Sequence, residues 1–304
     1  MDNNKVMIVG TGNVGASIAY SIINQRTAIN EIILTDIIAK DAEGEAMDLR
    51  DALAVAPSYA KISSGTYQDA RDCDVVVITA GAAQKPGETR MELLEKNVNI
   101  MKGMIEQIMA SGFNGILLVV TNPMDVLTYY AYKFSGLPSE RVIGSGTVLD
   151  SARLRARVAS YLNVNPKSVH AYQIGEHGDT ELTMWSLADL GGQSLTKLLD
   201  KPTRVGISNF VANEAYDIIE KKGATYYGIA TCVVDILNCI FNDELRVLPV
   251  SSYDHFSDTS FGWPSVVGRT GVQRRLDLKL SEHEGIELQK SINALKKAIS
   301  SVRF

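Results

Sequence analysis

Residues 5–36 have the sequence KVMIVGTGNVGASIAYSIINQRTAINEIILTD, which carries the main prediction of the fold. A short apolar run at residues 6–9 ends in the turn GTGNVG, a helix-like segment follows, and a second apolar run at residues 32–34 leads to Asp36. Dinucleotide-binding βαβ units have this same order of strand, glycine-rich turn, helix, strand and acid. A glycine turn in an ordinary βαβ unit is the alternative, and the acid after the second run makes it the weaker one.

Each of the three glycines in the turn has its own expected task. Gly10 would allow the tight turn, Gly12 would let the backbone approach a pyrophosphate, and Gly15 would let the helix pack closely on the strand. The helix N-terminus then offers N–H groups and partial positive charge to the phosphates. Asp36 follows about 20 residues later, where a carboxylate accepts from a ribose 2′-OH but repels a 2′-phosphate. The predicted cofactor is therefore NAD rather than NADP.

Length and composition are those of a globular protein. The chain has 304 residues, of which 45% are hydrophobic and 21% charged, enough for two domains with large cores. The net charge of −5 excludes a broad basic surface for nucleic acid or acidic membranes. No apolar run suggests a signal peptide or a transmembrane helix. The three cysteines have no metal-ligand spacing, so we predict buried thiols, no metal site and a cytoplasmic protein.

Apolar runs alternate with helical patterns in the first half of the chain. The predicted strands are residues 6–9, 32–34, 75–79, 116–121 and 141–144. Such β-branched runs are typical of strands that are buried on both faces of a parallel sheet. We predict an α/β fold with a Rossmann-type doubly wound sheet, forming an NAD-binding domain of residues 1–145. Ligands then lie beyond the carboxyl ends of the strands.

The pattern changes in the second half, which we expect to form an α+β catalytic domain of residues 146–304. Its predicted strands are residues 168–174, 180–187 and 246–252, and its predicted helices are residues 149–162, 208–222, 225–241 and 282–301. A loop with the sequence GEHGD separates the first two of these strands. We expect this domain to pack directly on the first, with the active site between them.

An enzyme that transfers hydride must also move a proton, and histidine suits this task near neutral pH. The chain has four histidines, which are His170, His177, His255 and His283. His177 stands out because it lies in the GEHGD loop, where backbone turns can present a side chain to a cleft. From the residues alone, an ordinary surface-loop histidine explains this position equally well.

Six motifs together resemble those of the lactate/malate dehydrogenase superfamily, and of its bacterial L-lactate dehydrogenases in particular. They run in the family's order over nearly the whole chain: residues 10–15 with Asp36, GAAQKPGETR (81–90), TNP (121–123), GSGTVLDSAR (144–153), GEHGDTE (175–181) and KGATYYGIA (222–230). Each motif alone is a modest signal, whereas six in register are a strong one. The resemblance implies an NAD-dependent enzyme of glycolysis and fermentation that interconverts (S)-lactate and pyruvate.

The resemblance also implies a catalytic pair. His177 would accept the proton of the 2-hydroxyl group and would return it when the keto acid is reduced. Asp150 would hold one ring nitrogen protonated and stabilise the imidazolium. Glu176 and Asp179 are closer to the histidine in sequence, but turn geometry is their expected role.

Two arginines are implied to bind the substrate. Arg153 would hold the substrate carboxylate, which a guanidinium matches at two points. Arg90 would polarise the carbonyl from a loop that closes over the substrate. Asn122 would orient substrate and nicotinamide, and Thr225 would line the pocket. Without the resemblance, solvated surface charge would be the better explanation of both arginines.

Gln84 carries the prediction of substrate specificity. The family's malate enzymes have an arginine at this loop position, which pairs with the second carboxylate of malate. A neutral amide gives no counter-charge, and a buried unpaired carboxylate costs several kcal/mol. Gln84 therefore favours pyruvate over oxaloacetate. A malate or broader 2-hydroxy acid dehydrogenase remains the alternative within this chemistry, and a non-catalytic dinucleotide-binding or structural protein is the alternative from another class.

The resemblance places the cofactor contacts mostly after the strands of the first domain. The expected residues are Gly10, Gly12, Val14, Gly15, Asp36, Tyr67, Gly81, Ala82, Val120, Asn122 and Ser145.

Arg155 and His170 suggest regulation. They match the pair that binds fructose 1,6-bisphosphate across a subunit interface in allosteric bacterial members, and cationic side chains suit an anionic sugar phosphate. An ordinary arginine and strand histidine explain the two positions about as well. The resemblance further implies a homotetramer. Two features depart from the family's pattern: residues 195–208 form a short segment, and Thr183 stands where many members have proline.

Overall fold

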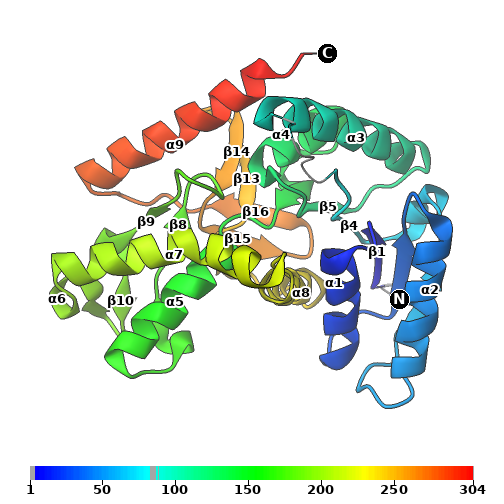
Figure 1. Cartoon of the computed structure of the whole chain (residues 1–304), viewed down its shortest axis with the longest axis horizontal. Helices are drawn as coiled ribbons and strands as arrows, with labels where there is room; N and C mark the ends of the chain where they lie inside the picture. The colour runs from blue at the N-terminus through cyan, green and yellow to red at the C-terminus, as the bar shows by residue number, and fades with distance from the viewer. Residues whose placement is uncertain (1–3, 83–86, 88, 304) are drawn as a thin grey trace.

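A large sheet lies at the centre of the molecule (Figure 1). The computed structural model of the chain describes residues 4–82, 87 and 89–303, and for Arg90 the backbone alone. The strands of the large sheet are β1 (Lys5–Val9), β2 (Glu31–Thr35), β3 (Lys61–Ser64), β4 (Val75–Ile78), β5 (Ile116–Val119), β6 (Val142–Gly144), β13 (Ser251–Asp254) and β14 (Thr259–Gly262). Their order is β14-β13-β6-β5-β4-β1-β2-β3. The strands β1 to β6 pair in parallel, which confirms the predicted Rossmann-type doubly wound sheet.

Helices cover both faces of the sheet, because successive strand residues point to opposite sides. Val6 and Ile8 of β1 belong to the core that helices α1 (Asn13–Asn24), α2 (Ala39–Ala52) and α8 (Tyr227–Phe241) close. Met7 and Val9 belong to the core on the other face, under α3 (Arg90–Ala110), α4 (Met124–Ser135) and α9 (Glu282–Ser301). Burial on both faces explains why these strands read as continuous apolar runs.

The second half of the chain is an α+β region built on three smaller sheets. Its further helices are α5 (Val148–Leu162), α6 (Leu195–Leu198) and α7 (Lys201–Lys222), and its strands are β7 (Val169–His170), β8 (Gln173–Ile174), β9 (Leu182–Thr183), β10 (Asp189–Leu190), β11 (Gln193–Ser194), β12 (Arg246–Leu248), β15 (Ser265–Gly268) and β16 (Gly271–Arg275). This half also supplies β13, which pairs antiparallel with β6 and extends the large sheet. The division at residue 145 stays a prediction.

Several elements differ from the predicted ones. Strand β3 at the sheet edge was not predicted, because its sequence KISS is mostly polar. The predicted strand 168–174 is two short strands, β7 and β8, and the predicted strand 180–187 contains only β9 and then a 3-10 turn, Trp185–Leu187. Pro249 separates β12 from β13, since it has no N–H to donate. Helix α7 begins at Lys201 instead of 208, where Asp200 caps it by accepting from the N–H of Thr203.

The three cysteines lie in the interior, as predicted. All are free thiols, and burial raises the pKa of Cys73 and Cys232 to about 12. At neutral pH these thiols are therefore protonated and unreactive, and they act as small apolar side chains. Within the described residues, no helix combines the length and the apolar character that a membrane span requires.

Candidate active site

A cleft lies where the carboxyl edge of the large sheet meets the second half of the chain. Its volume is ≈ 400 Å³. Its walls come from the start of α3, the residues after β5, the N-terminal turns of α5, the GEHGD loop and the middle of α7. Asn122, Asp150, Arg153 and His177 all line this cleft. The structure thus brings together site residues from three separate stretches of the sequence.

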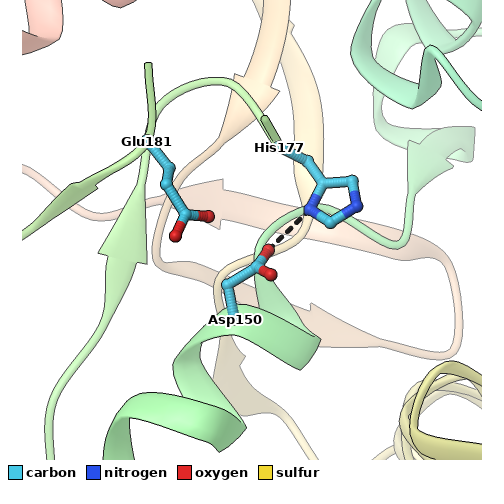
Figure 2. Close-up of side chains that lie close together, drawn as sticks. All are labelled: Asp150, His177 and Glu181. Atoms are coloured by element: carbon cyan, nitrogen blue, oxygen red, sulfur yellow. Dashed lines mark hydrogen bonds and ion pairs between the residues drawn. The ribbon is translucent and has the colours of Figure 1, made fainter. Parts of the chain in front are cut away.

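His177 and Asp150 are hydrogen-bonded at the wall of the cleft. Nδ1 of His177 lies 2.6 Å from Oδ2 of Asp150, and the other ring nitrogen, Nε2, points away from that carboxylate (Figure 2). Asp150 lies in the first turn of α5, where the helix N-terminus favours negative charge. Its side chain is buried, whereas about a quarter of the His177 side chain is exposed. The carboxylate therefore fixes the ring, and Nε2 is the nitrogen that can meet a substrate.

The two groups shift each other's protonation. The charge of Asp150 raises the pKa of His177 to about 9, although burial of the ring acts in the opposite direction. Burial alone would raise the pKa of Asp150, but the charge of His177, their hydrogen bond and the charge of Arg153 hold that pKa below its usual value. At neutral pH the pair is an imidazolium beside a carboxylate. Such a pair can give a proton to a carbonyl oxygen and later take it back.

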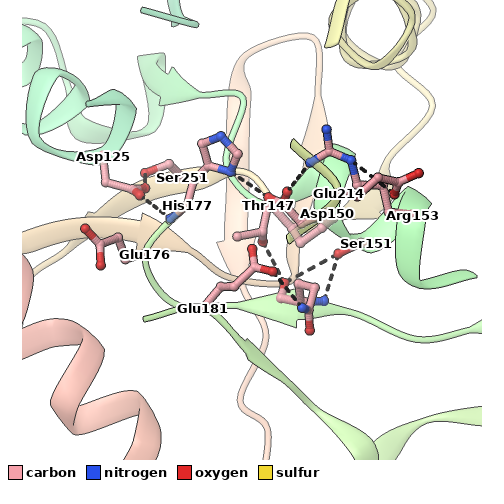
Figure 3. A network of polar contacts seen from close by, with 12 residues as sticks. Asp125, Thr147, Asp150, Ser151, Arg153, Glu176, His177, Glu181, Glu214 and Ser251 are labelled. Carbon is pink, nitrogen blue, oxygen red and sulfur yellow. Dashed lines mark hydrogen bonds and ion pairs between the residues drawn. The ribbon is translucent and has the colours of Figure 1, made fainter. Parts of the chain in front are cut away.

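Arg153 lies next to this pair on the same helix face. Its Nη1 donates to Oδ1 of Asp150 at 3.1 Å, and its Nε lies 3.6 Å from a carboxylate oxygen of Glu214 on α7 (Figure 3). Only 9% of the Arg153 side chain is exposed. A guanidinium held between two carboxylates at the cleft wall is oriented in advance, so it can bind a substrate carboxylate without first losing much side-chain freedom.

The GEHGD loop is held by three successive backbone N–H groups. The N–H of Gly175 donates to the carbonyl of Gly262 in β14 at 2.9 Å, and the N–H of Glu176 donates to the hydroxyl of Ser291 in α9 at 2.7 Å. The N–H of His177 donates to a carboxylate oxygen of Asp125 in α4 at 2.6 Å. Three different elements therefore fix the backbone that carries the histidine.

Asp125 helps to position His177, and the sequence did not predict this contact. It is 2% exposed, and its other carboxylate oxygen accepts from the Ser251 hydroxyl at 2.6 Å. Burial raises its pKa to about 7, against the effect of these two hydrogen bonds. The signal that could have found it is its place three residues after Asn122, on the helix that begins directly after the TNP motif.

The local alternatives to Asp150 are occupied elsewhere. The Glu176 carboxylate accepts from the Thr180 hydroxyl, and a carboxylate oxygen of Asp179 accepts from the Tyr216 hydroxyl at 2.7 Å. Neither acid is hydrogen-bonded to the ring of His177 in the described part of the chain. The structure thus pairs the histidine with the distant Asp150 rather than with its sequence neighbours.

The glycine turn has the shape that a dinucleotide requires. Gly10 has a φ of +97°, and a Cβ there would lie 2.7 Å from the backbone nitrogen of Ala80. A Cβ on Gly15 would lie 1.9 Å from the carbonyl oxygen of Gly10, so no other residue fits this helix start. At Gly12 a Cβ would meet no atom within 4 Å, which leaves that backbone open to a ligand.

Asp36 lies beside this turn. One oxygen of its carboxylate accepts from the backbone N–H of Thr11 at 2.7 Å, which fixes the carboxylate next to the glycines. The charge of Asp36 also contributes, after burial, to the raised pKa of Tyr67. An open backbone, a helix N-terminus and a fixed carboxylate are the features that NAD needs, so the residues present fit this cofactor.

The other expected cofactor contacts lie near the same edge. Gly81 and Ala82 follow β4, and the N–H of Ala82 donates to the side chain of Asn97 at 2.7 Å. Val120 and Asn122 follow β5, Ser145 follows β6, and Val14 is half-buried in α1. Thr225 is half-buried just before α8 and is not among the described residues that line the cleft.

Two predicted substrate residues are not placed by the structure. Gln84 lies outside the described residues. The backbone of Arg90 is described as the first residue of α3, directly after the capping residue Thr89, and its side chain lies outside the description.

The predicted effector residues lie away from the cleft lining. The side chain of His170 on β7 is 64% exposed, and its Nδ1 lies 3.4 Å from a carboxylate oxygen of Asp189. Arg155 is half-buried on α5, and its charge acts on the hydroxyl of Tyr172. Neither residue lines the cleft.

Two family profiles match almost the entire chain. Residues 4–144 match the lactate/malate dehydrogenase NAD binding domain, and residues 147–303 match the lactate/malate dehydrogenase alpha/beta C-terminal domain. The chain is 48% identical to L-lactate dehydrogenase 1 of Bacillus cereus, covering 98% of both chains. It is 49% identical to L-lactate dehydrogenase 2 of Bacillus anthracis, with the same coverage.

Solved structures with the same fold include two dehydrogenases. A lactate dehydrogenase from a deep-sea metagenome library of the Medee basin superposes with a TM-score of 0.96 at 46% identity, covering 99% of both chains. The minor L-lactate dehydrogenase of Enterococcus mundtii in its ligands-bound form superposes with a TM-score of 0.97 at 42% identity, covering both chains completely (100%). The ligands-unbound form of the Enterococcus enzyme gives a TM-score of 0.91.

Proposed function

The chain belongs to the lactate/malate dehydrogenase family of NAD-dependent oxidoreductases, and we propose that it is an L-lactate dehydrogenase that interconverts pyruvate and (S)-lactate. The hydrogen bond of 2.6 Å between His177 and Asp150, at the wall of a cleft that also contains Arg153, carries this proposal. A protein that only binds a dinucleotide has no need of a buried proton-transfer pair beside a carboxylate anchor.

The chemistry of the reduction divides between cofactor and protein. Bound NADH supplies the hydride. Arg153 binds the carboxylate of pyruvate and so places its carbonyl carbon in the cleft. Nε2 of the His177 imidazolium donates its proton to the carbonyl oxygen, and Asp150 stabilises the charged ring until then. Asn122 and Arg90 are assigned to orienting the substrate and polarising its carbonyl.

Substrate choice is assigned to Gln84. Its neutral side chain gives no partner to the second carboxylate of oxaloacetate, so a dicarboxylate would lose hydration without gaining a counter-charge. The relatives named L-lactate dehydrogenase support the same assignment.

The proposal also includes an allosteric activator and an oligomeric state. Arg155 and His170 are assigned to binding fructose 1,6-bisphosphate as an activator, in a homotetramer that works in the cytoplasm. The exposure of His170 supports this, because a ligand or a second subunit can reach it. If fructose 1,6-bisphosphate leaves both the pyruvate saturation curve and the oligomeric state unchanged, the assignment is wrong.

The test of the proposed function is a substrate panel. NADH absorbance is followed with pyruvate, oxaloacetate and branched 2-oxo acids, with and without fructose 1,6-bisphosphate. We expect pyruvate to have the highest kcat/KM, and Gln84→Arg to shift the preference toward oxaloacetate. If the unmodified protein prefers oxaloacetate, the assigned substrate specificity is wrong. If it turns over no 2-oxo acid, the assigned enzymatic activity is wrong.

A further inference from the structure

A third ionisable group lies against the catalytic pair. Glu181 precedes β9 and lines the cleft. Its carboxylate oxygen, a carboxylate oxygen of Asp150 and a ring nitrogen of His177 all lie within 4.8 Å of one another. Figure 2 shows the Glu181 carboxyl directed toward Asp150 from a segment other than α5. The proposed reaction gives this carboxyl no task.

Gln173 holds the Glu181 carboxyl in place. Its Nε2 donates to Oε1 of Glu181 at 2.9 Å. Gln173 is 1% exposed, and its backbone N–H donates to the hydroxyl of Ser151 on α5 at 2.8 Å. Its side-chain Oε1 is buried and has no hydrogen-bond partner among the described residues. A primary amide can donate to a carboxylate and, after rotation, accept from a carboxylic acid, so Gln173 suits both protonation states of Glu181.

The charged groups around Glu181 sum to a value that depends on its proton. Asp150 is negative, whereas Arg153 on the same helix and the His177 imidazolium are positive. With Glu181 neutral, these four groups carry one net positive charge, and with Glu181 ionised they carry none. Glu214 lies against Arg153 in both states. Loss of the Glu181 proton therefore lowers by one unit the charge that meets the substrate carboxylate.

The remaining acids near the cleft are tied to other partners. Glu214 on α7 lies against Arg153, and Asp125 on α4 binds the His177 backbone and the Ser251 hydroxyl. Glu176 and Asp179 in the loop accept from Thr180 and Tyr216. Glu181 is therefore the acid that faces the pair with only a neutral amide bound to it in the described residues.

The protonated state of Glu181 is favoured by its surroundings. Burial is the main cause, and the charge of Asp150 adds to it; together they raise the pKa of Glu181 to about 8. The positive charges of His177 and Arg153 act against this shift without cancelling it.

We infer that Glu181 is the charge-setting group of the substrate site, and that it must be protonated for a 2-oxo monocarboxylate to bind. This inference rests on the proposed function, since it assumes that His177 must also carry its proton. Binding then needs two protons on the protein. Because loss of either proton prevents binding, pyruvate binding weakens more steeply with rising pH than the titration of His177 alone would cause.

Mass action gives the expected pH dependence. When one proton is required, the dissociation constant rises tenfold per pH unit above the corresponding pKa, and when two are required it rises one hundredfold. In the unmodified protein, a plot of the logarithm of the dissociation constant against pH therefore reaches a limiting slope of two. Glu181→Gln is always neutral, so it keeps only the requirement for His177. In this variant the logarithm of the dissociation constant rises with a slope of one against pH. The pH at which binding begins to weaken is higher than in the unmodified protein, or the same.

The experiment measures binding rather than turnover. Oxamate, an unreactive isostere of pyruvate, is titrated into the protein–NADH complex, with NADH fluorescence as the signal, between about pH 6 and about pH 10. We expect a slope of two for the unmodified protein, one for Glu181→Gln, and two again for Glu181→Asp, which keeps a titrating carboxyl. KM for pyruvate should follow the same three profiles.

Each other result overturns the inference. A slope of one in the unmodified protein would mean that Glu181 does not titrate with binding. An onset that moves to lower pH in Glu181→Gln would mean that the ionised carboxylate assists the imidazolium. A slope of one in Glu181→Asp would assign the effect to packing. If oxamate does not bind and pyruvate is not turned over at any pH, the proposed function itself fails, and that result is distinct from the others.

Discussion

Replacing Asp150 by asparagine tests the catalytic pair without changing its shape. The charge of Asp150 is the largest of the influences that together raise the pKa of His177 from 6.5 to about 9. Without that charge, burial favours the neutral ring, so the pKa should fall to its usual value or below.

This shift predicts how the activity of Asp150→Asn depends on pH. At about pH 7.5 the unmodified ring is almost fully protonated, whereas the ring in the variant is protonated in about one molecule in ten. The kcat/KM for pyruvate should therefore fall at least about tenfold at this pH, and the deficit should grow until about pH 9. Below about pH 6 the protonation deficit disappears, and any remaining loss reflects the orientation of the ring.

The assay is NADH oxidation at low pyruvate over the pH range. The matched control is Glu287→Gln, which removes an exposed carboxylate that pairs with Lys290 on α9. The control should keep the unmodified pH profile. If Asp150→Asn keeps the pH profile of the unmodified protein, Asp150 does not set the protonation of His177.

The same shift has a consequence for stability. The pKa of His177 is higher in the folded protein, so the pair stabilises the native state below about pH 6.5, and this contribution is lost as the pH rises through about 9.

Three further variants test other parts of the site. Arg153→Lys removes the two-point contact with the substrate carboxylate, so kcat/KM for pyruvate should fall about 10²-fold. NADH affinity, measured by fluorescence, should stay unchanged, and an equal loss of NADH binding would contradict the role of Arg153 in binding the substrate. Asp125→Ala leaves the His177 N–H without its acceptor and should lower the free energy of unfolding in urea by about 1–3 kcal/mol. Asp125→Asn keeps an acceptor and should lower it less. Equal losses in the two variants would count against a stabilising role of this hydrogen bond. Asp36→Ser should shift the kcat/KM ratio of NADH to NADPH toward NADPH by about tenfold or more, and an unchanged ratio would remove Asp36 from cofactor selection.

Much of the fold could be predicted because burial on both faces leaves a plain sequence pattern. The runs at Val75–Ile78 and Ile116–Val119 contain only apolar residues, and each became a parallel strand of the sheet. The short strands of the second half left no such pattern. Strands β7 and β8 have two residues each, so their period cannot be recognised in the sequence. The pairing of β13 with β6 joins residues more than 100 apart (for example Ser251 with Gly144), and no local signal specifies it.

The candidate site also has residues that could be predicted from the sequence and residues that could not. The glycine turn and Asp36 could be recognised because a phosphate-binding turn constrains the residue types within a short stretch. The pairing of His177 with Asp150 rested on resemblance, since the two are 27 residues apart and acids such as Glu176 and Asp179 lie within two residues of the histidine. Asp125 and Glu181 were missed because their roles come from burial and from contacts across elements. A carboxylate in a sequence looks the same whether it will be solvated or enclosed.

In the proposed reaction the protonated His177 ring is the proton donor for pyruvate reduction. The most direct measurement compares kcat for pyruvate reduction between the unmodified protein and His177→Asn, with NADH binding measured on both. We expect kcat to fall by about 10²–10⁴-fold in the variant, with NADH affinity unchanged. A His177→Asn variant that turns over pyruvate at the unmodified rate would contradict this role of His177.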